Sequence, residues 1–132
     1  MGFPAATAQH QVISVDIHLQ MVPTPGGPVP TPLPAPFSGS LDGGLVQTVK
    51  IAGQPAAVKG STTTNQPSHL PTPPGTSYQT PPKNQGTVDM GSATVTLGGD
   101  PAARTGDPVK TCGDPSDLPT GQIIAAGTVL IG

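Results

Sequence analysis

Proline and glycine are spread along the whole chain and constrain its fold more than any other feature. The 132 residues include 19 prolines and 18 glycines. Proline removes a helical hydrogen bond and glycine raises the entropy cost of a helix, so helices are not expected. Between the prolines and glycines, β-branched residues occur in short runs bounded by glycine, which is typical of short strands. The expected fold class is all-β, with strands at 12–15, 46–51, 93–97 and 123–131.

The remaining composition narrows the class of protein. The length suits one domain, residues 1–132, and the scarcity of charge (9%) argues against disorder. No apolar run approaches the roughly 18 to 20 residues that cross a bilayer, so an integral membrane protein is not expected. The first ten residues, MGFPAATAQH, do not resemble a secretory signal, which predicts synthesis in the cytoplasm. Five Lys and Arg against seven Asp give no basic footprint for nucleic acid.

A Pro-Ala-Ala segment occurs three times. Residues 46–61 (VQTVKIAGQPAAVKGS) align with residues 92–107 (SATVTLGGDPAARTGD), each reading as a strand, a Gly-x-Pro-Ala-Ala turn and a second short strand. The N-terminus supplies a third copy, 2–6, in which the preceding strand is missing. The copies extend over about 1–20, 46–70 and 86–132. Such internal repetition predicts a fold with pseudo-threefold symmetry.

Each copy is followed by one residue that binds transition metals. His18 lies 14 residues after Pro4, His69 lies 14 after Pro55, and Cys112, the single cysteine, lies 11 after Pro101. Taken singly, a lone Cys is more often a small buried apolar residue, and a lone His a hydrogen-bonded one. The similar spacing favours metal binding, because unrelated residues have no reason to recur at nearly the same distance from a repeated turn.

The sequence offers more than one candidate for the fourth metal ligand. Structural zinc takes four N or S ligands, and His10 is the remaining histidine. In the other two copies its position is taken by Ser61 and Asp107, so water or Asp16 is an alternative to His10. A metal is also needed on general grounds. With Phe3, Phe37 and Tyr78 as the only aromatic residues the core is thin, and one cysteine makes no internal disulfide.

The third copy begins with Pro101-Ala102-Ala103-Arg104, continues as TGDPVKTCGDP and ends in GTVLIG. These segments resemble the PAAR-repeat family, whose members cap the spikes of contractile injection systems. The resemblance implies a small three-sided β cone with Zn²⁺ near its sharp end, bound by three His and one Cys. By position this set carries over to Cys112, His18 and His69, and with less support to His10. It also implies a trimeric VgrG-like or phage-needle-like spike as partner, one tip per trimer. The tip itself would be a monomer that contacts the target membrane transiently and is delivered outside the cell or into a target cell.

The resemblance leaves several alternatives open. The apparatus is either a type VI secretion system or an extracellular phage-tail-like particle, and effectors are possible additional partners. Residues 22–40 are expected to form a Pro-rich loop, either packed along the cone or acting as a polyproline ligand. Catalysis is not expected, because the chain has no Glu and no H-E-x-x-H motif. We expect docking to the spike through strand edges near these residues: Val49, Ile51, Val95, Leu97, Ile123, Val129 and Ile131.

Overall fold

The fold is all-β, as the sequence predicts. The computed structural model describes residues 2–132, and no helix occurs in that range. Accordingly, none of the described residues belongs to a helix that is long and apolar enough to span a membrane. The strands are β1 (Phe3–Pro4), β2 (Gln11–Val22), β3 (Val29–Gly43), β4 (Val46–Ile51), β5 (Gln54–Ala56), β6 (Thr62–Asn65), β7 (Ser77–Tyr78), β8 (Gln85–Val88), β9 (Thr96–Leu97), β10 (Asp100–Pro101), β11 (Pro108–Thr111), β12 (Leu118–Ile124) and β13 (Leu130–Ile131).

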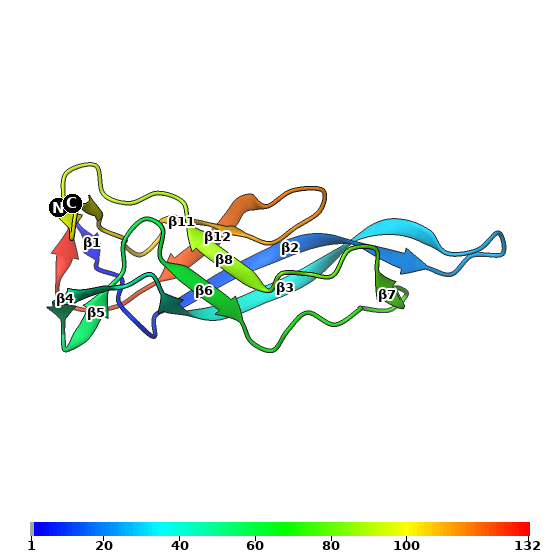
Figure 1. The fold of residues 1–132 in the computed structure, drawn as a ribbon, viewed down its shortest axis with the longest axis horizontal. Helices are drawn as coiled ribbons and strands as arrows, with labels where there is room; N and C mark the ends of the chain where they lie inside the picture. Colours follow the sequence, from blue (N-terminus) through cyan, green and yellow to red (C-terminus); the bar gives the residue numbers. More distant parts are fainter. Residues whose placement is uncertain (1) are drawn as a thin grey trace.

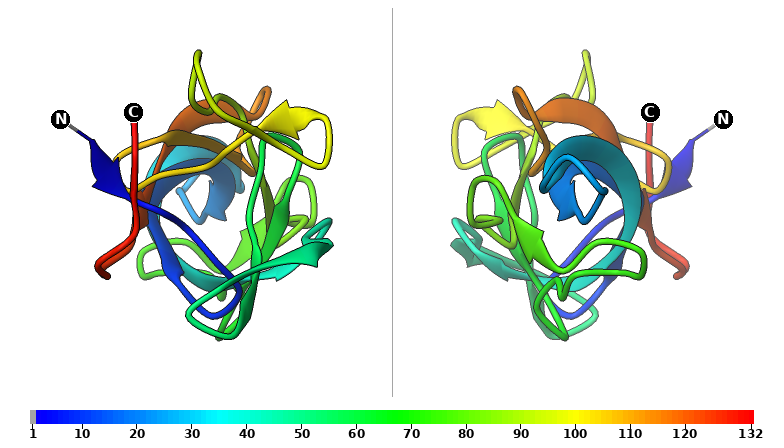
Figure 2. Two further views of the ribbon diagram at one scale, coloured as in Figure 1. Left: turned by 90° about the vertical axis from the view of Figure 1, so that its left-hand side faces the viewer. Right: turned by 90° about the vertical axis from the view of Figure 1, so that its right-hand side faces the viewer.

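Six of these strands form one antiparallel sheet that closes on itself. The order is β12-β11-β8-β6-β3-β2, and β2 pairs back onto β12, while β7 adds to β2 near its end. Figure 1 shows the molecule tapering from a broad end, where both termini lie, to the narrow β2–β3 hairpin. The two views along the long axis show the strands running around a common centre (Figure 2).

The Pro-rich segment 22–40 is not a loop, which corrects the prediction. It belongs almost entirely to the β2–β3 hairpin, whose register runs from Gln11↔Ser40 to Val22↔Val29. Four prolines occupy every second position of β3 and are all exposed: Pro30, Pro32, Pro34 and Pro36. Along this stretch β3 pairs only with β2, since its pairing with β6 begins at Gly39. Proline is tolerated where its nitrogen faces away from the neighbouring strand, so the alternation fits an edge strand.

The interior of the closed sheet is too narrow for a side chain at several positions. Gly39, Gly86 and Gly121 all lie on inward-facing positions of their strands. A Cβ on Gly39 would meet the backbone of Thr64, and one on Gly86 or Gly121 would lie about 3.0 Å from a threonine methyl group. The apolar core fills the remaining space, with Phe37, Leu41 and Ile123 its largest fully buried apolar side chains.

The Pro-Ala-Ala copies meet on the long axis at the broad end. Their backbones form a closed ring of three hydrogen bonds: Ala6 N–H to the Ala103 carbonyl (2.9 Å), Ala57 to Ala6 (3.0 Å) and Ala103 to Ala57 (3.0 Å). These alanines are at most 1% exposed. Only a very small side chain allows three segments of the chain to approach so closely on one axis, which accounts for the Ala-Ala pairs.

Each copy also carries a short two-stranded pair, β1–β13, β4–β5 or β9–β10, and the three lie around the axis in Figure 2. The strand that the N-terminal copy lacks in sequence is supplied by β13 from the other end of the chain. The equivalence holds residue by residue, since Pro4, Pro55 and Pro101 pair with Leu130, Lys50 and Thr96. The expected continuous strand 123–131 is therefore wrong: β12 ends at Ile124 and belongs to the closed sheet, whereas β13 belongs to the broad end.

Candidate metal centre

Three of the predicted ligands come together with one acidic residue inside the closed sheet, in the half nearer the tip of the β2–β3 hairpin, here called the narrow half. The group consists of Asp16, His18, His69 and Cys112, whose candidate ligand atoms all lie within 4.8 Å of one another. Asp16 and His18 are alternate, inward-facing residues of β2, Cys112 follows β11, and His69 lies in the segment after β6. The side chains of Asp16, His18 and His69 are 0%, 2% and 3% exposed.

Two of the separations between these atoms match those of a tetrahedral zinc site. Zinc bonds of about 2.0 to 2.3 Å imply that its ligand atoms lie about 3.3 to 3.6 Å apart. Cys112 Sγ lies 3.6 Å from His18 Nε2 and 3.4 Å from Asp16 Oδ2. His69 Nε2 lies 2.9 Å from Asp16 Oδ2, so this pair must open slightly to admit an ion. The residues therefore fit a metal ion with a mixed N, S and O ligand set.

Neighbouring hydroxyls orient the Asp16 carboxylate. Its Oδ1 accepts hydrogen bonds from Ser14 Oγ (3.1 Å) and from Thr111 Oγ1, which leaves Oδ2 facing His69 and Cys112. The alternation of β2 places Ser14, Asp16 and His18 on one face of the strand. His10 would fall on that face too, but it lies eight residues from His18, about 26 Å along an extended strand, whereas Asp16 lies two residues away. This difference in distance, visible in the sequence, favours Asp16 over His10.

Cys112 is held in its neutral form in the absence of a cation. Burial, with a smaller contribution from the negative charge of Asp16, raises the pKa of the thiol to about 11. A divalent ion would reverse this, because it stabilises the thiolate that binds it. With Cys112 and Asp16 both ionised and both histidines neutral, a divalent ion would leave the buried site without net charge.

His69 is positioned by Asn84, a residue that sequence reasoning did not identify. The Asn84 side-chain oxygen accepts the His69 backbone N–H (2.7 Å) and a hydrogen bond from the Asn65 amide (3.1 Å). Asn84 has φ 57°, a left-handed conformation that Asn tolerates better than most residues. The available signal was the Asn-Gln-Gly sequence (84–86), in which Asn84 immediately precedes β8; asparagine and glycine are typical of turns.

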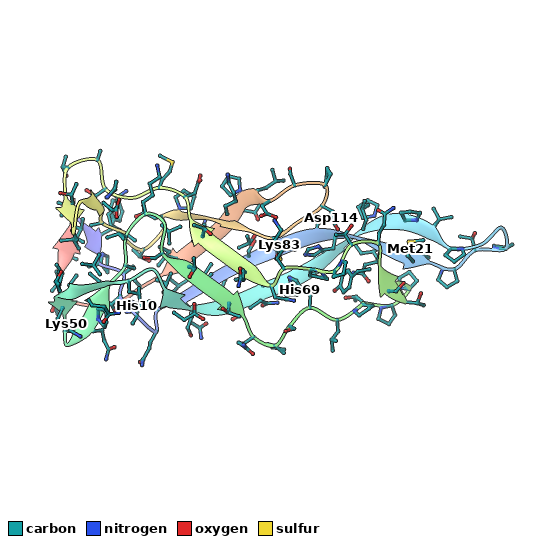
Figure 3. The ribbon with its side chains drawn as sticks, in the orientation of Figure 1. His10, Met21, Lys50, His69, Lys83 and Asp114 are labelled. Carbon is teal, nitrogen blue, oxygen red and sulfur yellow. The ribbon has the colours of Figure 1, made fainter. Side chains whose placement is uncertain are left out.

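His10 is not part of the cluster, and its position has a different role. Figure 3 shows it near the broad end, far from His69 along the long axis. Its Nδ1 accepts the backbone N–H of Thr7, closing a turn, and the two other copies close the same turn with an oxygen. The three equivalent bonds are Thr7 N to His10 Nδ1 (3.0 Å), Val58 N to Ser61 Oγ (3.0 Å) and Arg104 N to Asp107 Oδ2 (2.7 Å). The shared requirement is an acceptor, and Asp16 takes the place in the cluster predicted for His10.

We expect His10→Ala to destabilise the protein by about 1 to 2 kcal/mol, because a nearly buried N–H of Thr7 loses its acceptor. His10→Asp and His10→Ser introduce the acceptors used by the other copies and should retain most of the stability. Urea unfolding measures both effects. All three variants should bind as much metal as the wild type, and a loss of metal in His10→Asp would restore His10 as a ligand.

The predicted docking residues are only partly accessible. Ile123 is 0% exposed and Ile131 5%, so neither offers a docking surface; Ile123 belongs to the core of the closed sheet and Ile131 to a smaller cluster at the broad end. Val129 is 44% exposed, and the others, Val49, Ile51, Val95 and Leu97, are half-buried. Ile51, Val95 and Leu97 pack on the same small cluster as Ile131.

No family model matches this chain, and no curated protein matches it either. The fold and the site define its class as an all-β protein with a closed antiparallel sheet and a buried cluster that could hold a metal ion.

Proposed function

We propose that this protein is a PAAR-like tip of a contractile injection system, a small cap on a trimeric spike that a structural zinc ion holds rigid. The main support for the proposal is that metal-binding residues from the three repeat copies meet at one place in the structure. Each of three Pro-Ala-Ala copies is followed by one metal-binding residue, and His18, His69 and Cys112 meet in one buried cluster.

Zinc is the ion that this ligand set favours. A thiolate and two imidazoles suit zinc, and a carboxylate is also among its common ligands. The set differs from the family pattern in having Asp16 where a third His is expected. Four protein ligands fill a tetrahedral sphere, which favours a structural role over catalysis, because catalytic zinc keeps a position for water or substrate.

The broad end supports docking to a trimer. Its three strand pairs and its ring of alanine hydrogen bonds repeat around one axis, so three equivalent surfaces face a threefold partner. One tip would bind three spike chains. The docking residues we now propose are Val49, Ile51, Val95, Leu97 and Val129, which lie on or beside these pairs.

The exterior of the β2–β3 hairpin (residues 11–43) supports passage of the tip into a membrane. Strand β2 reverses the usual polarity: Asp16 and His18 point inward, whereas Ile13, Val15 and Ile17 are 44–58% exposed. The charged residues of the β2–β3 hairpin are Asp16, which is buried, and Asp42, near its broad-end side. An apolar exterior lowers the cost of contact with lipid, where exposed charges are expensive.

The test of the docking role is to mix the purified protein with the trimeric spike of its own apparatus and measure the stoichiometry by light scattering. We expect one tip per three spike chains. A complex with three tips per trimer, or no complex, would contradict the proposed function.

Zinc binding should release protons, and more readily at higher pH. Because the pKa of Cys112 is about 11, the metal-free thiol is protonated at pH 7.5 and must lose its proton to bind. The contribution of Cys112 to the apparent affinity therefore rises about tenfold per pH unit below that pKa. Calorimetry in buffers of different ionisation enthalpy should find about one proton released per ion at pH 8. No proton release would mean that the thiol does not bind the metal.

A further inference from the structure

His18 has a second ring nitrogen that faces away from the cluster. Its Nε2 points toward Cys112, so Nδ1 is the outer atom. The His18 side chain is 2% exposed, and among the described residues Nδ1 makes no hydrogen bond of good geometry. The nearest charged atom is Oδ2 of Asp114, 3.4 Å away.

Asp114 is fixed in this position by the strand that carries His18. Its backbone N–H donates to the carbonyl of Ile17 (2.9 Å), and its Oδ2 accepts the backbone N–H of Leu19 (3.0 Å). The loop after Cys112 is thus attached to β2 on both sides of His18. Figure 3 shows Asp114 beside the narrow half of the sheet, in the same region as His69.

A small cleft leads from the surface to the ligands at this point. It measures about 40 Å³ and is lined by His18, Cys112, Lys83, Asp114 and Asp117, among others. Asp114 is 15% exposed and therefore lies between the solvent and His18. Asp117, in the same cleft, pairs instead with Lys83 on the surface (3.0 Å).

We propose that Asp114 is a positioning residue of the metal centre: its carboxylate holds the Nδ1–H of His18 and thereby directs Nε2 to the metal. This inference rests on the proposed metal site. A ligating histidine commonly donates its other N–H to a carboxylate, which fixes the ring and makes the ligating nitrogen more basic. A shift of a few tenths of an ångström would bring the 3.4 Å contact to hydrogen-bond length.

The test compares Asp114→Asn with Asp117→Asn. Both substitutions remove one negative charge from the same cleft, and both keep an oxygen that can accept the existing backbone hydrogen bond, from Leu19 or from Gly113. In Asp114→Asn this oxygen also faces Nδ1 of His18, so the variant replaces a charged acceptor with a neutral, weaker one. Zinc affinity is measured by competition with a chromogenic chelator. We expect Asp114→Asn to weaken binding about 10- to 100-fold and to speed zinc loss, with Asp117→Asn within about twofold of the wild type.

A second measurement separates positioning from a general structural effect. In the zinc-loaded wild type, the Nδ1–H proton of His18 should give a protected, downfield NMR signal, which moves upfield in Asp114→Asn and stays in place in Asp117→Asn. Equal zinc affinities for the two variants, or an unmoved signal, would overturn the role of Asp114 alone. A wild-type protein that binds no zinc would overturn this inference and the proposed metal site together.

Discussion

Removing the metal ion should lower the melting temperature of this protein by about 15 °C or more. An ion held at about ten thousand times its dissociation constant stabilises the folded state by roughly 5 kcal/mol. For a chain of this length, each kcal/mol corresponds to about 3 to 5 °C. The effect is large because the metal would bind groups from three segments far apart in sequence, at 16–18, 69 and 112, in a region with little apolar core. Calorimetry with and without a strong chelator measures it.

The matched control for this experiment is Cys112→Ser. Serine preserves the size of the side chain but does not provide a thiolate, so the variant should melt near the temperature of the chelated wild type. Chelator should then have no further effect on it. If Cys112→Ser melts like the untreated wild type and still responds to chelator, Cys112 is not a ligand.

The second large effect is expected from one added methyl group in the closed sheet. In Gly39→Ala the new Cβ would fall on the backbone carbonyl of Thr64 and within 2.7 Å of the Thr63 hydroxyl. Backbone atoms cannot move aside without opening the β3–β6 pairing, so we expect a loss of about 3 kcal/mol or more in the free energy of unfolding. Urea unfolding of the zinc-loaded protein measures this loss.

Gly127→Ala is the control for that substitution. Gly127 has open space around the position of a Cβ, so alanine there should change stability by less than about 0.5 kcal/mol. A Gly39→Ala protein as stable as Gly127→Ala would show that the sheet is wider or more easily deformed than the structure indicates.

The sequence predicted three residues of the cluster because they recur at similar distances, 14, 14 and 11 residues, from a repeated turn. His18, His69 and Cys112 were found in this way, although the cluster lies inside the sheet and the β2–β3 hairpin extends beyond it to the narrow tip. Asp16 was predicted only as an alternative to His10 for the fourth ligand, since the other copies have no acidic residue at the equivalent position. Its selection depends on strand alternation and on the hydroxyls of Ser14 and Thr111, which tertiary structure brings together.

Two features of the fold were missed for physical reasons. Proline is generally a poor strand residue, and its occurrence at every second position of β3 becomes favourable only because that part of β3 is an edge. The missing strand of the N-terminal copy was hidden because it lies at the opposite end of the chain. Thr128-Val129-Leu130-Ile131 matches Thr48-Val49-Lys50-Ile51 and Thr94-Val95-Thr96-Leu97, a similarity that was visible in the sequence once closure of the repeat around an axis is considered.

X-ray absorption at the zinc edge of the purified protein tests the central claim most directly. The account predicts about one zinc ion per chain, with one sulfur ligand near 2.3 Å and three nitrogen or oxygen ligands near 2.0 to 2.1 Å. Replacing Asp16 with Ala should remove one of the lighter ligands or exchange it for water, and replacing His10 should change nothing. A protein purified without metal, or a zinc ion with no sulfur in its coordination shell, would contradict the account.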